Sequence, residues 1–246
     1  MSDASSTSIA ENIARVQEQV AAACRSTGRP EIDVALMAVS KMHSAESIAE
    51  AVSAGLRLFG ENRVQEWQQK QPQVAQLIGP TIRPAIHLIG PLQSNKTAKA
   101  AELFDAIDTV DSLRIATRLH QAPKQLGRKL PVLIEVKLSP EETKHGIAPD
   151  ELPSLLRGLE PLDSLLPSGL MTVPPWSEDP EPARPYFRRL RELRDAALPR
   201  CPALTQLSMG MSNDFRVAIE EGSTCIRIGT AIFGRRHYPQ QQETAI

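Results

Sequence analysis

The feature that most constrains the fold is a regular alternation of short apolar runs with segments of helical periodicity. Eight runs rich in aliphatic residues are each followed by a helix-like segment, and this pattern predicts parallel strands separated by helices. Strands are expected at 34–40, 57–59, 85–89, 106–110, 132–138, 169–173, 203–207 and 224–228. Helices are expected at 44–54, 63–71, 94–103, 112–119, 182–197 and 212–221, with a further helix beginning near Pro149.

Eight such units in a chain of 246 residues fit a single (β/α)8 barrel, a fold of about 250 residues. The alternative is a doubly wound open sheet. Dinucleotide-binding sheets of that kind carry G-x-G-x-x-G after the first strand, and no such motif follows the first apolar run here. We therefore expect an α/β protein with one barrel domain over residues 1–246.

An additional helix is expected before the barrel. Residues 1–30 contain a stop signal at Gly28 and Pro30, and their apolar residues fall at helical spacing: Ile9, Ile13, Val16 and Val20. This segment is predicted to pack on the barrel. Residues 235–246 are expected to form a C-terminal tail.

The composition excludes several classes of function. The formal net charge of -1 predicts no bulk attraction to nucleic acid or to an anionic membrane, and an aromatic content of 4% disfavours base-stacking modules. No apolar run is long enough to span a bilayer, and the N-terminus lacks the pattern of a secretory signal. Three widely separated cysteines argue against a disulfide framework or a zinc site. We expect a cytoplasmic protein with reduced thiols.

Lys41 ends the first apolar run, where its amine would be partly desolvated. In a barrel, functional groups gather at the carboxyl ends of the strands, which is where Lys41 is expected. A desolvated lysine amine is suited to forming a Schiff base with an aldehyde. On this segment alone, a lysine that reaches water at the strand end is the alternative.

The loops after the last two predicted strands resemble a phosphate site. Ser208 and Ser212 supply hydroxyl groups around Gly210, and Gly229 and Thr230 follow the eighth strand. Loops in these two positions often bind phosphate in barrels, because they present backbone N–H groups at helix N-termini. A pair of ordinary capped turns is the alternative interpretation.

Arg227, in the eighth strand, is expected between Lys41 and the phosphate loops. A ligand with an aldehyde and a phosphate fits this layout, which suggests pyridoxal 5′-phosphate (PLP). An arginine donates hydrogen bonds and does not accept them, so at the pyridine nitrogen it would keep that nitrogen unprotonated and weaken the ring as an electron sink. A structural salt bridge is the alternative for Arg227, and an aldolase-type enzyme acting on a phosphorylated sugar is the alternative for the whole site.

At this point the chain resembles the pyridoxal phosphate homeostasis proteins of the YggS/PROSC type. The resemblance extends from the first strand nearly to the chain end. The segments that carry it are 38–41 (AVSK), 59–62 (FGEN), 64–66 (VQE), 87–96 (HLIGPLQSNK), 169–172 (GLMT), 207–212 (LSMGMS) and 226–234 (IRIGTAIFG).

The resemblance implies an alanine-racemase-like barrel of fold type III that binds PLP in vitamin B6 homeostasis, holding and releasing it without substrate turnover. It implies a Schiff base on Lys41, contact of Arg227 with the pyridine nitrogen, and cofactor binding by Asn62, His87, Met171, Ser208, Ser212, Gly229 and Thr230. PLP-dependent apo-enzymes are the expected recipients, and a monomer is expected because the β-domain through which racemases of this type dimerise is not recognised in the chain.

Four positions depart from the family pattern: Arg63, Ala85, Lys137 and His145. None of them removes an expected cofactor contact, so the cofactor site is expected to be kept, and their effect on the rim around it is left open by the sequence. The recipient, the release trigger and any residual activity are left open by the sequence.

The main alternative function is a PLP-dependent amino-acid racemase on the same barrel. Racemisation needs a base on each face of the substrate, and racemases of this type use a tyrosine as the second base. The two tyrosines here, Tyr186 and Tyr238, are not expected near the site. An RNA-binding surface on the arginine-rich segment 184–194 is less favoured, because its apolar residues follow helical spacing and its arginines are expected to face solvent.

Overall fold

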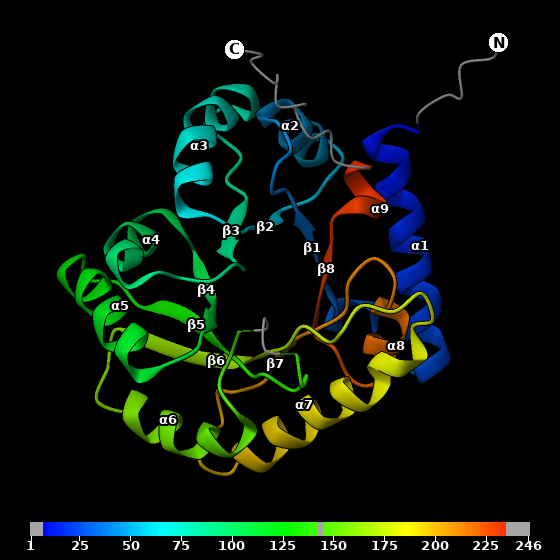
Figure 1. Cartoon of the computed structure of the whole chain (residues 1–246). Coiled ribbons are helices and arrows are strands. Elements are labelled where there is room, and N and C mark those ends of the chain that lie inside the picture. The colour runs from blue at the N-terminus through cyan, green and yellow to red at the C-terminus, as the bar shows by residue number, and fades with distance from the viewer. Residues whose placement is uncertain (1–6, 142–144, 235–246) are drawn as a thin grey trace, which may run out of the picture.

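Eight parallel strands close into a barrel in the computed structural model, which describes residues 7–141 and 145–234 (Figure 1). Strand β1 pairs with β2 on one side and with β8 on the other, which closes the ring. The strands are β1 (Ala35–Val39), β2 (Leu58–Glu61), β3 (Ala85–Leu88), β4 (Ala106–Val110), β5 (Leu130–Glu135), β6 (Leu165–Met171), β7 (Gln206–Ser208) and β8 (Cys225–Ile228). The predicted (β/α)8 barrel is confirmed.

The helices surround the barrel (Figure 1). They are α1 (Ile9–Thr27), α2 (Ala45–Ser53), α3 (Val64–Ile78), α4 (Thr97–Leu103), α5 (Leu113–Gln125), α6 (Leu152–Leu159), α7 (Arg184–Ala197), α8 (Phe215–Glu220) and α9 (Thr230–Phe233). Short 3-10 turns lie at Glu31–Asp33, Ser94–Lys96, Pro149–Glu151 and Glu181–Ala183.

Helix α1 is the expected additional helix. It begins after a capping box in which the Ser8 hydroxyl and the Glu11 carboxylate each accept a backbone N–H, and it ends at Gly28, whose φ of 67° is left-handed. The Asn12 side chain donates a hydrogen bond to the Ile232 carbonyl at 2.9 Å, so this helix is attached directly to α9.

The fifth strand is shorter than the apolar run predicts. The regular strand ends at Glu135, and Val136 then bridges Ile147 while the Lys137 N–H donates to the Ile147 carbonyl. The chain beyond Glu135 therefore pairs with its own return loop, although the Val136 N–H still donates to the Met171 carbonyl of β6 at 2.8 Å. Strand β6 begins at Leu165, before the predicted start at 169, and β7 occupies 206–208 in place of 203–207.

Two helices continue through a proline, whereas the prediction ended them earlier, at residues 71 and 119. Helix α3 includes Pro72 and α5 includes Pro123. Packing outweighs the lost backbone hydrogen bond, because Trp67 and Val74 on one face of α3 are both buried, and Pro123 is itself buried in α5. Helix α9 has four residues and is too short to produce a periodic signal.

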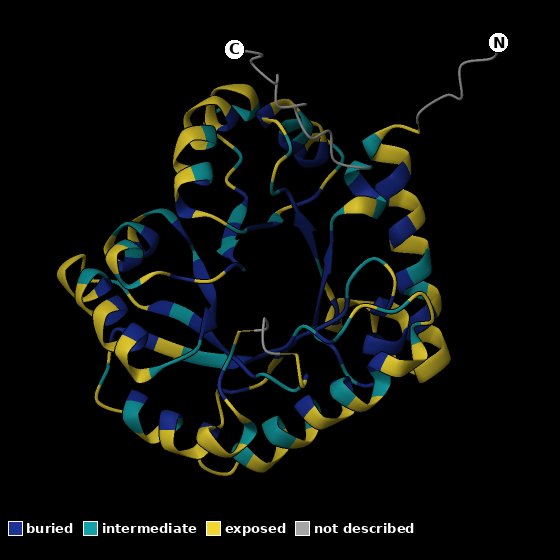
Figure 2. Cartoon of the chain, viewed as in Figure 1, coloured by how far each residue is buried: buried dark blue, intermediate teal, exposed yellow. Residues whose placement is uncertain are grey.

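The strands and the inward faces of the helices are buried, and the exposed residues lie mainly on the outer helix faces (Figure 2). No helix among the described residues is both long and apolar enough to cross a bilayer. The predicted tail at 235–246 lies outside the described residues.

Candidate functional site

A cavity of about 470 Å³ lies at the carboxyl ends of the strands. Parallel strands bring these ends to one rim of the barrel, so residues far apart in sequence meet there. The lining residues are Val39, Lys41, Asn62, Ile89, Gly90, Pro91, Glu135, His145, Val173, Trp176, Ser177, Met211, Ser212, Asn213, Asp214, Arg227, Gly229 and Thr230.

Six of the nine predicted site residues line this cavity, namely Lys41, Asn62, Ser212, Arg227, Gly229 and Thr230. The other three are not among its lining residues. Ser208 and Met171 are buried, and the His87 side chain is 20% exposed. Of the four departures from the family pattern, His145 reaches the cavity lining, whereas Arg63, Ala85 and Lys137 are not part of it.

Arg227 on β8 is 4% exposed, and its guanidinium is held from two sides. One terminal nitrogen donates to the Ser208 hydroxyl on β7 and the other to the Thr172 carbonyl after β6, each at 2.8 Å. Burial lowers the pKa of Arg227, while the charges of Cys225, Asp108 and other acidic groups act to raise it. The guanidinium is thus a fixed donor group at the cavity surface.

Beside the cavity, His87 on β3 pairs with Asp108 on β4 through Nδ1 and Oδ1 at 3.1 Å. Burial alone would lower the pKa of His87, but the charge and hydrogen bond of Asp108 raise it above its ordinary value. Asp108 Oδ2 is buried without a hydrogen-bond partner in the described part of the chain. The ring of His87 therefore has a set orientation.

The loops after β7 and β8 meet at the cavity. The Ser212 hydroxyl accepts the Ala231 N–H at 3.5 Å, which places it against the first turn of α9. That helix begins at Thr230, and the leading N–H groups of a helix have no acceptor within the helix itself. Asp214 Oδ1 accepts the Met211 N–H at 2.6 Å and shapes the first of the two loops.

Asn62, after β2, and Gly90, after β3, form another part of the cavity wall. Asn62 Oδ1 is buried and has no hydrogen-bond partner among the residues described, although the side chain lines the cavity. A buried, unpaired amide oxygen is costly unless a ligand or water completes it. A Cβ at Gly90 would lie 2.2 Å from the Asn62 carbonyl oxygen, so glycine permits the loops after β2 and β3 to touch.

Trp176, Asn213 and Glu135 line the cavity without having been among the predicted site residues. Trp176 is 72% exposed and belongs to the proline-rich loop after β6, a loop whose place in the chain was the available signal. The Asn213 side chain donates to the carbonyls of Ser177 and Glu178 at 2.7 and 3.1 Å, which joins that loop to the one after β7. No local pattern in the sequence indicates this link.

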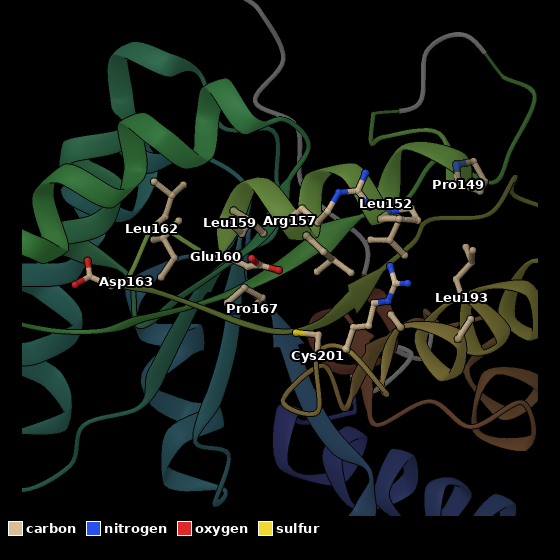
Figure 3. A pocket seen from close by; sticks show the side chains of 16 residues that line it. Pro149, Leu152, Arg157, Leu159, Glu160, Leu162, Asp163, Pro167, Leu193 and Cys201 are labelled. Carbon is tan, nitrogen blue, oxygen red and sulfur yellow. The ribbon is translucent and has the colours of Figure 1, made fainter.

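A second cavity of about 480 Å³ lies outside the barrel, between α6, α7 and the start of β6 (Figure 3). It is lined mainly by apolar residues such as Leu152, Leu159 and Leu193, with Arg157 and Cys201 among the others. None of the predicted site residues belongs to it. The two cavities are almost equal in size, so the converging polar groups, and not volume, distinguish the site at the barrel rim.

Comparison with known proteins identifies the family. Residues 6–237 match the profile of the alanine racemase N-terminal domain. The pyridoxal phosphate homeostasis protein of Pseudomonas aeruginosa is 45% identical over 233 residues, covering 94% of this chain and 96% of the relative. That of Escherichia coli K12 is 42% identical over 240 residues, covering 95% and 99%. The chain belongs to the pyridoxal phosphate homeostasis protein family.

Solved structures agree with this membership. PipY of Synechococcus elongatus with PLP bound is 40% identical, with a TM-score of 0.79 over 92% of this chain and all of PipY. An unknown protein from Bifidobacterium adolescentis is 35% identical, with a TM-score of 0.85 over 91% and 94%. Alanine racemase of Clostridium difficile is 15% identical, with a TM-score of 0.66 over 91% of this chain and 60% of the racemase, and shows the shared barrel fold alone.

Proposed function

We propose that this protein binds PLP in the cavity at the barrel rim, holds it as a Schiff base on Lys41, and releases it without turning over a substrate. The observation that carries the proposal is the convergence of Lys41, Arg227 and the loops containing Ser212 and Thr230 on one cavity. The names of the relatives, and the bound PLP in the PipY structure, support the same ligand.

The cavity fits the proposed ligand in size and in chemistry. Its volume of about 470 Å³ lies within the range of small-molecule sites, roughly 300–1,000 Å³. PLP supplies an aldehyde when bound. The unprotonated amine of Lys41 would condense with that aldehyde, forming a C=N bond and releasing one water molecule, and addition of water reverses the step. A reversible covalent bond suits a protein that holds and then hands over its ligand.

The phosphate group would bind between the loops after β7 and β8. Ser212 and Thr230 provide hydroxyl groups there, and the first N–H groups of α9 point out of its N-terminus. Gly229 permits a ligand to approach the backbone closely, because it carries no side chain. This donor set needs no aromatic contact and matches a dianionic oxygen ligand.

Arg227 would face the pyridine nitrogen. The hydrogen bonds to Ser208 and Thr172 keep its guanidinium in place, so we propose that Ser208 acts through Arg227 and does not contact the phosphate. An arginine at that nitrogen donates to it without protonating it, which leaves the ring a weak electron sink. This arrangement favours holding the ligand over carbanion chemistry.

The opposite side of the ring would lie against Asn62, whose buried amide oxygen has no partner in the described chain. His87 and Met171 would support the ring from behind, since neither lines the cavity directly. Asp108 orients His87 for this role through the 3.1 Å contact.

The racemase alternative finds no support in the described lining of the cavity, which contains no tyrosine. Tyr186 lies on α7, and Tyr238 lies outside the described residues.

Cys24, Cys201 and Cys225 are unpaired, as suits the reducing cytoplasm in which we expect the protein to act.

The direct test is reduction of the PLP-loaded protein with borohydride, followed by peptide mass spectrometry. The pyridoxyl group is expected on Lys41 and is expected to be absent from Lys41→Ala. Lys137→Ala is the matched control, because Lys137 follows β5 near the same rim without lining the cavity, and it should be labelled like the wild type. A pyridoxyl group on any other lysine in the wild type would overturn the assignment.

Two further measurements address turnover and release. The loaded protein is expected to show no racemisation of alanine or serine, and a robust activity that vanished in Lys41→Ala would refute the proposed carrier role. The loaded protein is either mixed with the apo form of a PLP-dependent enzyme or separated from it by a dialysis membrane. The enzyme should regain activity as the loaded protein loses the absorbance of its bound PLP. Retention of the ligand over hours under both conditions would contradict release.

A further inference from the structure

Lys41 is carried by a strained turn. The His43 N–H donates to the Ser40 carbonyl at 3.1 Å, which closes a β-turn with Lys41 and Met42 at its centre. Met42 has a φ of 63°, and it is the one non-glycine residue with positive φ in the described chain. A positive φ at the third position of a turn favours glycine or asparagine, because a larger side chain collides with the backbone.

An ion pair on α3 holds the backbone of this turn at three points. The Glu66 carboxylate accepts the Met42 N–H at 2.5 Å. The Lys70 ammonium donates to the carbonyls of Ser40 and His43, at 3.0 and 3.3 Å, and to Glu66 at 2.9 Å. The two ends of the turn and its strained centre are therefore attached to one turn of one helix.

Glu61 also pairs with Lys70 and contacts the start of the turn. Its side chain is fully buried, and its Oε1 accepts from Lys70 at 2.7 Å and from the Ser40 hydroxyl at 2.8 Å. Burial raises the pKa of Glu61, although Lys70 opposes that shift. Burial would also raise the pKa of Glu66, but the hydrogen bonds of Lys70 and of the Met42 N–H lower it.

The same turn touches the proposed phosphate loop on its other side. The His43 ring stacks on Phe233 with ring centroids 4.7 Å apart. Phe233 ends α9, the helix that begins at Thr230 in the cavity lining. Lys41 thus sits between two contacts that locate its backbone, one to α3 and one to α9.

We propose that Lys70, with Glu61 and Glu66, is a positioning group for Lys41: it holds the strained turn so that the Lys41 amine faces the cavity. This inference rests on the proposed function. It also assigns different roles to two nearby lysines. The Lys70 ammonium lies within hydrogen-bond distance of four oxygen atoms and holds the backbone of the turn, whereas Lys41 lines the cavity.

The test compares Glu66→Leu with Glu66→Gln and measures the rate of PLP uptake by absorbance and the dissociation constant by equilibrium dialysis. The leucine variant removes the acceptor of the Met42 N–H, so the left-handed conformation of Met42 loses a stabilising contact. Its PLP dissociation constant is expected to rise about fivefold to thirtyfold, the factor that corresponds to the energy of one left-handed residue. The glutamine variant keeps an acceptor oxygen and is expected to stay within about threefold of wild type. Lys70→Met should resemble the leucine variant. Lys99→Met on α4, which removes a partly exposed lysine that pairs, in the described chain, with Glu102 alone, should resemble wild type.

Rescue distinguishes positioning from general stability. Glycine adopts positive φ without cost, so Met42→Gly combined with Glu66→Leu is expected to restore PLP affinity to within about threefold of wild type. If the network only stabilised the fold, Glu66→Leu would lower the melting temperature, and adding Met42→Gly would not restore PLP uptake.

The outcomes separate the two proposals. Failure of the wild type to form the borohydride-stable label on Lys41 defeats the proposed function. A labelled wild type with equal affinities in Glu66→Leu and Glu66→Gln defeats the positioning role. That comparison also decides the case in which Lys70→Met does not fold, since both Glu66 variants keep the buried pair of Lys70 with Glu61.

Discussion

Replacing Gly90 with alanine tests whether close contact between two loops shapes the proposed site. The added Cβ would lie 2.2 Å from the Asn62 carbonyl oxygen, 2.8 Å from its Cα and 2.9 Å from its carbonyl carbon. The shortest distance falls about 1.2 Å below ordinary contact at 3.4 Å. All three atoms are backbone, so no side-chain rotation relieves the overlap, and the loop after β2 must move by about 1 Å.

The expected cost follows from that displacement. Overpacking of a well-packed region costs about 1–3 kcal/mol, which corresponds to a fall in melting temperature of about 2–12 °C for a chain of this size. Because the moved loop carries Asn62 in the cavity wall, PLP affinity should fall by about tenfold or more. Urea denaturation of the apo protein and a spectrophotometric PLP titration measure the two effects.

Gly229→Ala is the matched control for stability. Its Cβ would meet its nearest neighbour, the Val39 carbonyl oxygen, at an ordinary 3.4 Å, so the free energy of unfolding should change by less than about 0.5 kcal/mol. If Gly90→Ala were as stable as Gly229→Ala and bound PLP as tightly as wild type, the argument from close contact would be wrong.

Three further predictions concern the groups around the site. The pKa of His87, measured by NMR, should exceed its ordinary value and should fall in Asp108→Asn, because only the charge of Asp105 then opposes the effect of burial. The stabilisation from the pair is complete below about pH 6.5 and is lost as pH rises through the raised pKa. Glu221 is buried, and the arginines of α7 that contact it lower its pKa despite burial. Glu221→Gln should therefore reduce the free energy of unfolding by about 1–3 kcal/mol at pH 7. This difference from wild type should shrink as pH falls from about 4.5 through the lowered pKa. Asn12→Ala should cost about 1–3 kcal/mol by denaturation, because the carbonyl of Ile232 loses its buried donor. A His87 pKa unaffected by Asp108→Asn, a pH-independent Glu221→Gln difference or a neutral Asn12→Ala would each contradict the corresponding contact.

The arrangement of the last loops illustrates what local pattern could reach. Ser212, Gly229 and Thr230 were predicted to meet because two strand ends of a parallel barrel must lie at one rim, and the structure brings them to the same cavity. Ser208 was predicted as a phosphate ligand from the same loop. In the structure Ser208 is buried, and its hydroxyl accepts a hydrogen bond from Arg227. The reason is that β7 extends to Ser208, one residue further than predicted, and that residues of a strand alternate between its two faces.

By itself, the sequence determined the order of strands and helices, the barrel that follows from it, and the positions of Lys41 in the turn after the first strand and of Arg227 on the last strand. Hydrophobic periodicity and turn chemistry are local signals, and a parallel barrel leaves few ways to arrange eight such units. Tertiary structure alone decided which polar groups pair. Asp108 orients His87, Asn213 joins two loops, and Lys70 reaches back across the turn of Lys41, each through contacts between residues on different elements. Such contacts depend on the angles at which strands and helices pack, and no spacing along the chain encodes them.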